Sequence, residues 1–236
     1  MEKSYSIKQI ARIAGFWYLL LGIGAGYSWI YTTKVFVAGN AALTANNILH
    51  SESQYLIAIV SSIIGQVAFI MLGLALYRLL KHVHETQARI MITFVLVSVP
   101  IMFVNIIFQT EVLFVLNRAD YLNVFSTEQI NSLSLLFLNL YFTGVHIVEI
   151  FWGLWLFPFS YLVYKSNYFP KFFTVLLILA GISYLIGSLA YLINLKFYST
   201  IQMYLSIPES IGELSIVFWL LLKGVKEQKT IKEELS

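Results

Sequence analysis

A histidine and a glutamate lie one helical turn apart in a segment that is otherwise almost wholly apolar. The segment, GVHIVEIFWGLW, runs from Gly144 to Trp155 and contains His146 and Glu149. An imidazole and a carboxylate at this spacing can share a proton or supply nitrogen and oxygen ligands to a metal ion. Either chemistry requires that the pair be shielded from lipid, because hydrocarbon does not solvate charge.

The same segment carries further polar residues on one face. At about 100° per residue, a single arc of roughly 120° holds Asn139, Thr143, His146, Glu149 and Gly153. Such a stripe on an apolar helix is expected to face protein or water. Counting about 1.5 Å per residue from the predicted cytoplasmic helix ends places Gln66, Asn105, His146 and Glu149 at similar depths, about 21 to 26 Å from the inner boundary.

The last apolar stretch contains a proline and two more carboxylates. From Pro208 to Leu222 there are too few residues to cross a membrane core of about 30 Å. We therefore expect residues 201–207 to complete the span and Pro208 to break the helix at membrane depth, as in the discontinuous helices of transporters. Glu213 then lies near the midplane, about 14 Å from the inner boundary.

Together these residues predict one interior polar cavity between the third, fourth and sixth spans. His146 is expected to bridge Glu149 and Glu213, with help from Asn105, Asn139 and Gln66. Glu111 is rotated by roughly 120° from Asn105 on the third span, so it is assigned to the outer rim together with Glu209.

Three functions fit this cavity, and they belong to different classes. The preferred hypothesis is binding or transport of a small molecule or ion, because ionisable groups inside a membrane are costly and mark functional sites. A metal-dependent enzyme would use His146, Glu149 and Glu213 or Glu209 as ligands, but the H-x-x-E pattern lacks the second histidine of HExxH, and no motif indicates a cofactor. An accessory or sensor protein would act through helix contacts, and a purely structural tie between helices also remains open.

The composition shows which elements must hold these residues. Of 236 residues 59% are hydrophobic and 11% are charged, the balance of a membrane protein. Long apolar runs predict an all-α chain with a single transmembrane domain over 1–236 and a cytoplasmic tail over 223–236. The six expected spans are 10–31, 55–80, 90–116, 135–163, 172–195 and 201–222.

Basic residues indicate the orientation. Of the 15 Lys and Arg residues, 12 fall on one side of the predicted topology: Lys3, Lys8, Arg12, Arg78, Lys81, Arg89, Lys165, Lys171, Lys223, Lys226, Lys229 and Lys232. The positive-inside rule then makes both termini cytoplasmic in a plasma-membrane protein. The net charge of +3 follows from this topology and gives no reason to expect a nucleic-acid partner.

Two features point to contacts outside the polar cavity. In the first extracytoplasmic loop, GNAALTANNIL offers Asn40 as a helix cap and predicts a short helix at the outer surface. Gly22 and Gly26 have GxxxG spacing, which allows another backbone to approach closely. We prefer packing within the chain for this pair, and a homodimer is the alternative.

Several stretches resemble a known family. These are AGFWYLLLGIGAG, GNAALTANNILHSES, PFSYLVYKSNYFPKFFTVLLILAGISYLIGSLA and GELSIVFWLLLKGVK. Together they are similar to the bacterial six-span membrane family known as domain of unknown function 4386, over about residues 11–226. The resemblance implies a multi-pass plasma-membrane protein without assigned catalytic residues. Its GEL and WLL elements match Gly212, Glu213, Leu214, Trp219, Leu220 and Leu221.

Overall fold

The chain folds into a bundle of long helices. The computed structural model describes residues 6–117, 120–194 and 196–225, so most of the predicted tail, including Lys229, lies outside the described residues. Within these ranges the chain is helical and contains no strand. The elements are α1 (Ile7–Val35), α2 (Ala41–Leu49), α3 (Glu52–Leu80), α4 (Glu85–Leu116), a 3-10 turn (Asp120–Leu122), α5 (Thr127–Ser166), α6 (Phe172–Leu192) and α7 (Tyr198–Leu222).

Six of these helices are long and apolar enough to cross a membrane, namely α1, α3, α4, α5, α6 and α7. They coincide with the six predicted spans, and the protein is a multi-pass membrane protein. Most of them extend beyond the predicted ends because polar caps prolong them. Ser6 with Gln9 and Ser126 with Gln129 form capping boxes that open α1 and α5, an arrangement that satisfies free backbone donors.

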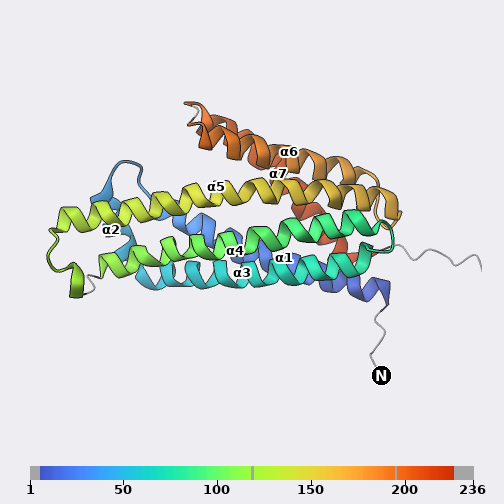
Figure 1. Cartoon of the computed structure of the whole chain (residues 1–236), viewed down its shortest axis with the longest axis horizontal. Helices are drawn as coiled ribbons and strands as arrows, with labels where there is room; N and C mark the ends of the chain where they lie inside the picture. Colours follow the sequence, from blue (N-terminus) through green and yellow to red (C-terminus); the bar gives the residue numbers. More distant parts are fainter. Residues whose placement is uncertain (1–5, 118–119, 195, 226–236) are drawn as a thin grey trace, which may run out of the picture.

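The helices form a row of four with a hairpin against it. α1 packs on α3, α3 on α4 and α4 on α5, whereas α6 packs on α5 and α7 on α1 and α6. Figure 1 shows α3, α4 and α5 along the long axis and the α6–α7 hairpin inclined to them. Gly224 lies against Lys8, so α1 begins where α7 ends. We call this the terminal end, and the opposite end, which carries α2, the α2 end.

The short helix after the first span is present. Asn40 caps α2 as expected, with its Oδ1 atom accepting a hydrogen bond of 2.9 Å from the backbone N–H of Leu43. α2 packs mainly against α5, and so it closes one end of the bundle.

Close helix crossing in α1 uses a different glycine from the expected pair. A Cβ atom on Gly24 would lie 2.6 Å from the carbonyl oxygen of Ser61, whereas Gly22 and Gly26 have nothing within 4 Å. The preferred interpretation of the Gly22/Gly26 pair as an intramolecular contact was therefore wrong. Gly24 points toward α3, and residues two positions away point elsewhere on a helix.

The predicted break at Pro208 was also wrong. α7 is one continuous helix of 25 residues with Pro208 inside it. The argument from length took Pro208 as a helix boundary, but α7 runs through it from Tyr198 and is about 36 Å long, enough to cross the core. The proline removes a single backbone donor, which membrane helices tolerate.

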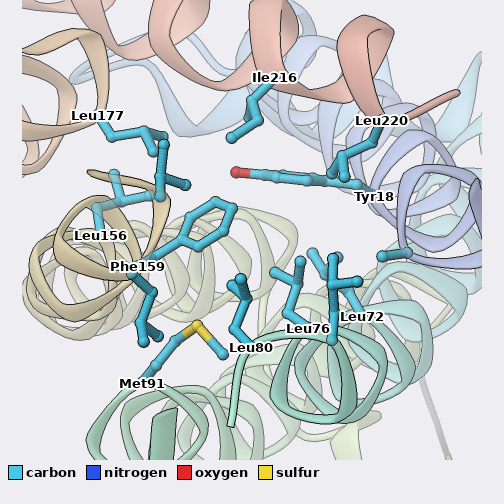
Figure 2. Packing of buried hydrophobic residues seen from close by; sticks show 14 of the residues in the cluster. Tyr18, Leu72, Leu76, Leu80, Met91, Leu156, Phe159, Leu177, Ile216 and Leu220 are labelled. Carbon is cyan, nitrogen blue, oxygen red and sulfur yellow. The ribbon is translucent and has the colours of Figure 1, made fainter. Parts of the chain in front are cut away.

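An apolar core near the terminal end joins the row to the hairpin. Figure 2 shows Leu72, Leu76 and Leu80 of α3 facing Ile216 and Leu220 of α7, with Leu156 and Phe159 of α5 beside them. The ring of Tyr18 lies in this core, and its oxygen points across the core toward the side of Leu177. That oxygen belongs to the site described next.

Candidate functional site

His146 and Glu149 form a buried pair at the middle of α5. The Nδ1 atom of His146 lies 2.6 Å from the Oε2 atom of Glu149, and the two residues are 2% and 8% exposed. Ser188 of α6 donates a hydrogen bond of 2.5 Å to the backbone carbonyl of His146. This contact fixes α6 against the turn of α5 that carries the pair.

Aromatic rings from three other helices surround His146. The Tyr191 ring lies 3.8 Å from the imidazole between centroids, and the Trp29 ring packs edge-on at 6.2 Å. The hydroxyl of Tyr198, the first residue of α7, lies 3.2 Å from Nε2 of His146. The imidazole therefore contacts a carboxylate on one side and a phenol on the other.

Glu213 lies on α7 and is held by two tyrosines. The hydroxyls of Tyr18 of α1 and Tyr184 of α6 each donate a hydrogen bond of 2.6 Å, to Oε2 and Oε1 respectively. Hydrogen bonds to a charged acceptor are about twice as strong as neutral ones. This carboxylate therefore has a donor for each oxygen and joins three helices.

Glu209, one turn before Glu213 on α7, has the poorest set of partners. It is 8% exposed, and Nε2 of Gln202 approaches its Oε2 atom at 3.4 Å. Its Oε1 atom has no hydrogen-bond partner among the described residues. Glu209 interacts electrostatically with Glu149 and Glu213, so we call Glu149, Glu209 and Glu213 together the carboxylate cluster.

The structure places the other expected residues elsewhere. Asn105 is buried on α4, donates a hydrogen bond of 2.8 Å to the carbonyl of Tyr141 and lies against Gly144. Gln66 is buried on α3 with an unpartnered Oε1 atom, and Glu111 is half-buried on α4. No recorded contact joins these three to the cluster. Its walls are α1, α5, α6 and α7, so the first and fifth spans replace the third.

Asn139 differs most from expectation, because it is exposed and bonds only the carbonyl of Leu135 in its own helix. α6 contacts α5 at His146 and ends at Leu192. Asn139 belongs to the same polar stripe of α5 but lies two turns before His146, beyond the end of α6, so α6 does not cover it. Glu209, in contrast, was assigned to the outer rim and is buried, one turn before Glu213 on α7.

Sequence reasoning missed the tyrosines. Tyr18 had the position of an interfacial aromatic residue near the end of a span, yet it is buried and bonds Glu213. Tyr184, Ser188 and Tyr191 follow one another at spacings of four and three on α6, which places them on one face. That spacing was a detectable signal for a second polar helix face.

A surface pocket lies beside the His146 site. It has a volume of about 440 Å³ and is lined by Tyr191, Asn194, Lys196, Tyr198 and Ser199 at the α6–α7 turn. Two of these residues, Tyr191 and Tyr198, contact His146. These two tyrosines therefore separate the pocket from His146. We call this pocket the turn pocket.

The ligand set for a metal ion is not assembled. Within residues 6–117, 120–194 and 196–225, no group of three or more His, Asp or Glu side chains lies close enough to hold an ion. His146 and Glu149 pair with each other, and Glu213 pairs with tyrosines. The predicted His146 bridge between Glu149 and Glu213 was therefore wrong, because the second ring nitrogen of His146 faces Tyr198.

Comparison with known proteins identifies a relative and a family. A protein of Archaeoglobus fulgidus named "Uncharacterized protein" is 30% identical over 98 residues, which cover 40% of this chain and 54% of the relative. The chain thus spans about half the length of this curated relative. No solved structure matches. Residues 13–224 match the family described as Domain of unknown function (DUF4386), and the chain belongs to this family of uncharacterised membrane proteins.

Proposed function

We propose that the protein binds or transports a small molecule or ion at the carboxylate cluster, between α1, α5, α6 and α7. The distribution of Lys and Arg supports an orientation with both termini in the cytoplasm of a bacterial cell. In that orientation the terminal end faces inward, α2 lies at the outer surface, and the turn pocket opens to the outside.

The observation that carries the proposal is the unpartnered Oε1 atom of buried Glu209. A structural tie between helices explains the His146–Glu149 pair and the two tyrosine bonds to Glu213. It does not explain a third carboxylate, because a buried polar atom without a partner costs about 1–3 kcal/mol. A site that receives a ligand accounts for this cost.

The accessory role rests on a different surface. Gly22 and Gly26 face open space on α1, and this face would form the contact of a homodimer. Neither role requires the other to be absent, since Gly22 and Gly26 take no part in the contacts of the cluster.

The test is a thermal-shift screen of the protein in lipid nanodiscs against inorganic ions, amines, amino acids, sugars and nucleosides. A ligand of the cluster should stabilise the wild type by mass action, and should lose this effect in Glu209→Gln. Glu111→Gln is the matched control, since Glu111 is a half-buried glutamate on α4 outside the cluster. A screen in which no compound distinguishes wild type from Glu209→Gln contradicts the proposal.

A further inference from the structure

We propose that the ligand of the carboxylate cluster is a protonated amine that enters through the turn pocket and donates hydrogen bonds to Glu209 and Gln202. This inference rests on the proposed function and names its ligand class. The argument comes from the charges, the unpartnered atoms and the aromatic walls of the site.

The acidic side chains of the cluster outnumber the basic ones. Glu149 faces His146, but neither Glu209 nor Glu213 has a Lys or Arg among its recorded hydrogen-bond or electrostatic partners in the described residues. Glu209 and Glu213 are four residues apart on one helix, where like charges repel. Buried charges are normally paired, so the cluster favours a ligand that brings positive charge.

The unpartnered atoms where Glu209 meets Gln202 are both acceptors, so this place calls for a donor. Glu209 Oε1 and Gln202 Oε1 are both buried acceptors without a hydrogen-bond partner, and the two side chains approach each other at 3.4 Å. An anion or a carbonyl compound would bring further acceptors to this place. An ammonium group carries only donors and a positive charge, and it therefore matches both atoms.

The walls of the route are aromatic. Tyr191 and Tyr198 line the turn pocket and contact His146. The ring of Trp29 also packs against the imidazole of His146. Deeper in the bundle, Trp152 and Tyr184 pack edge to face at 6.4 Å, and Tyr184 bonds Glu213. Aromatic faces attract cations, and they suit organic ammonium ions in particular.

A divalent metal ion fits the site less well. Such an ion needs several converging oxygen or nitrogen ligands, and the described residues contain no group of three acidic or histidine side chains that could hold one. A single ammonium group needs only two or three acceptors.

The experiment uses a size-matched series on the nanodisc protein at neutral pH: n-butylammonium, 1-butanol and butyrate, with sodium chloride and magnesium chloride as separate arms. Only n-butylammonium is expected to raise the melting temperature of the wild type and to give a saturable binding curve. Glu209→Gln should weaken this binding at least about tenfold, and Glu111→Gln should retain it.

A second variant keeps the test valid if Glu209→Gln folds poorly. Gln202→Leu removes an acceptor and no charge, and it should weaken n-butylammonium binding while leaving the melting temperature of the ligand-free protein unchanged or higher. The inference is overturned if butanol, butyrate or a metal ion stabilises the protein as well as n-butylammonium does, or if the ammonium binds both glutamate variants equally. A ligand of another class in the screen would leave the proposed function standing and refute only the amine.

Discussion

Two glutamates one turn apart on α7 have opposite surroundings. Glu213 receives a hydroxyl donor on each oxygen, whereas Glu209 has one long contact to Gln202 and one unpartnered oxygen. The same chemical change at the two positions should therefore have opposite effects on stability, and this contrast separates a ligand site from a structural tie.

Glu209→Gln should stabilise the ligand-free protein. The change removes a buried charge that lies near two other carboxylates, and relief of such a charge is worth about 1–3 kcal/mol. For a chain of this size each kcal/mol shifts the melting temperature by about 2–4 °C. A melting curve in nanodiscs measures the effect, and a clear fall would show that Glu209 has a structural partner.

Glu213→Gln should destabilise the protein. The amide accepts only one of the two tyrosine hydroxyls without rearrangement, and bonds from Tyr18 and Tyr184 to a neutral group are weaker than bonds to a carboxylate. We expect a loss of about 1–3 kcal/mol in the free energy of unfolding. Tyr18→Phe is the matched partner, because it removes a single donor and should cost less. Equal stability of Glu213→Gln and wild type would contradict this assignment.

The residues of the site were only partly predictable. His146, Glu149 and Glu213 are identifiable because charged side chains in apolar helices are costly and must face inward. Their partners Tyr18, Tyr184 and Tyr198 were not predicted, since periodicity shows which face of a helix is polar and not which helix lies against it. Asn139 failed for the same reason, because only the structure shows that α6 ends beside His146.

At the scale of elements, the spans were well predicted and their crossings were not. Hydropathy identifies the part of a helix inside hydrocarbon, so every span was found. It does not identify the helix ends: the span predicted over 135–163 belongs to α5, which extends from Thr127 to Ser166. Close crossings depend on which glycine faces a neighbour, and α1 offers Gly22, Gly24 and Gly26 within five positions. The neighbour determines that Gly24 is the contact.

Gly24→Ala should weaken the packing of α1 on α3. The added methyl group would overlap the carbonyl of Ser61 and the backbone of Gly65, and overpacking of this kind costs about 1–3 kcal/mol. Gly26→Ala in the same helix meets open space and is the control, with a stability equal to or slightly above that of the wild type. If Gly26→Ala instead shifts the protein to a smaller oligomer in size-exclusion chromatography with light scattering, the Gly22/Gly26 face forms a dimer.

Lys196→Gln tests the route through the α6–α7 turn. Lys196 is exposed and is the one basic residue among the described residues that line the turn pocket. Removal of its positive charge should speed the entry of a cation and tighten n-butylammonium binding a few-fold at low salt. The effect should be smaller at about 1 M salt, because the Debye length there is only about 3 Å. Weaker binding in this variant would indicate an anionic ligand or another entrance.

At the scale of the whole molecule, the six candidate spans of the described residues bring the start of α1 and the end of α7 to one side. This agrees with the contact of Gly224 with Lys8. The distribution of basic residues assigns that side to the cytoplasm. Most basic residues of the described chain lie at or near helix ends on the terminal side of the bundle: Lys8, Arg12, Arg78, Lys81, Arg89, Lys165, Lys171 and Lys223. Lys34 and Lys196 lie on the opposite side.

The orientation can be tested directly because the chain contains no cysteine. Single cysteines at Asn46 in α2 and at Thr86 in the first turn of α4 are both exposed in the structure, and they lie at opposite ends of the bundle. In intact cells a membrane-impermeant maleimide should label Asn46→Cys and should label Thr86→Cys only after the membrane is opened. Asn123→Cys, in the connection between α4 and α5, is a second outer position. Labelling of Thr86→Cys in intact cells, with Asn46→Cys protected, would reverse the orientation and direct the turn pocket toward the cytoplasm. The carboxylate cluster would then be loaded from inside the cell, and the Lys196→Gln effect on amine uptake would appear in inside-out vesicles instead of in cells.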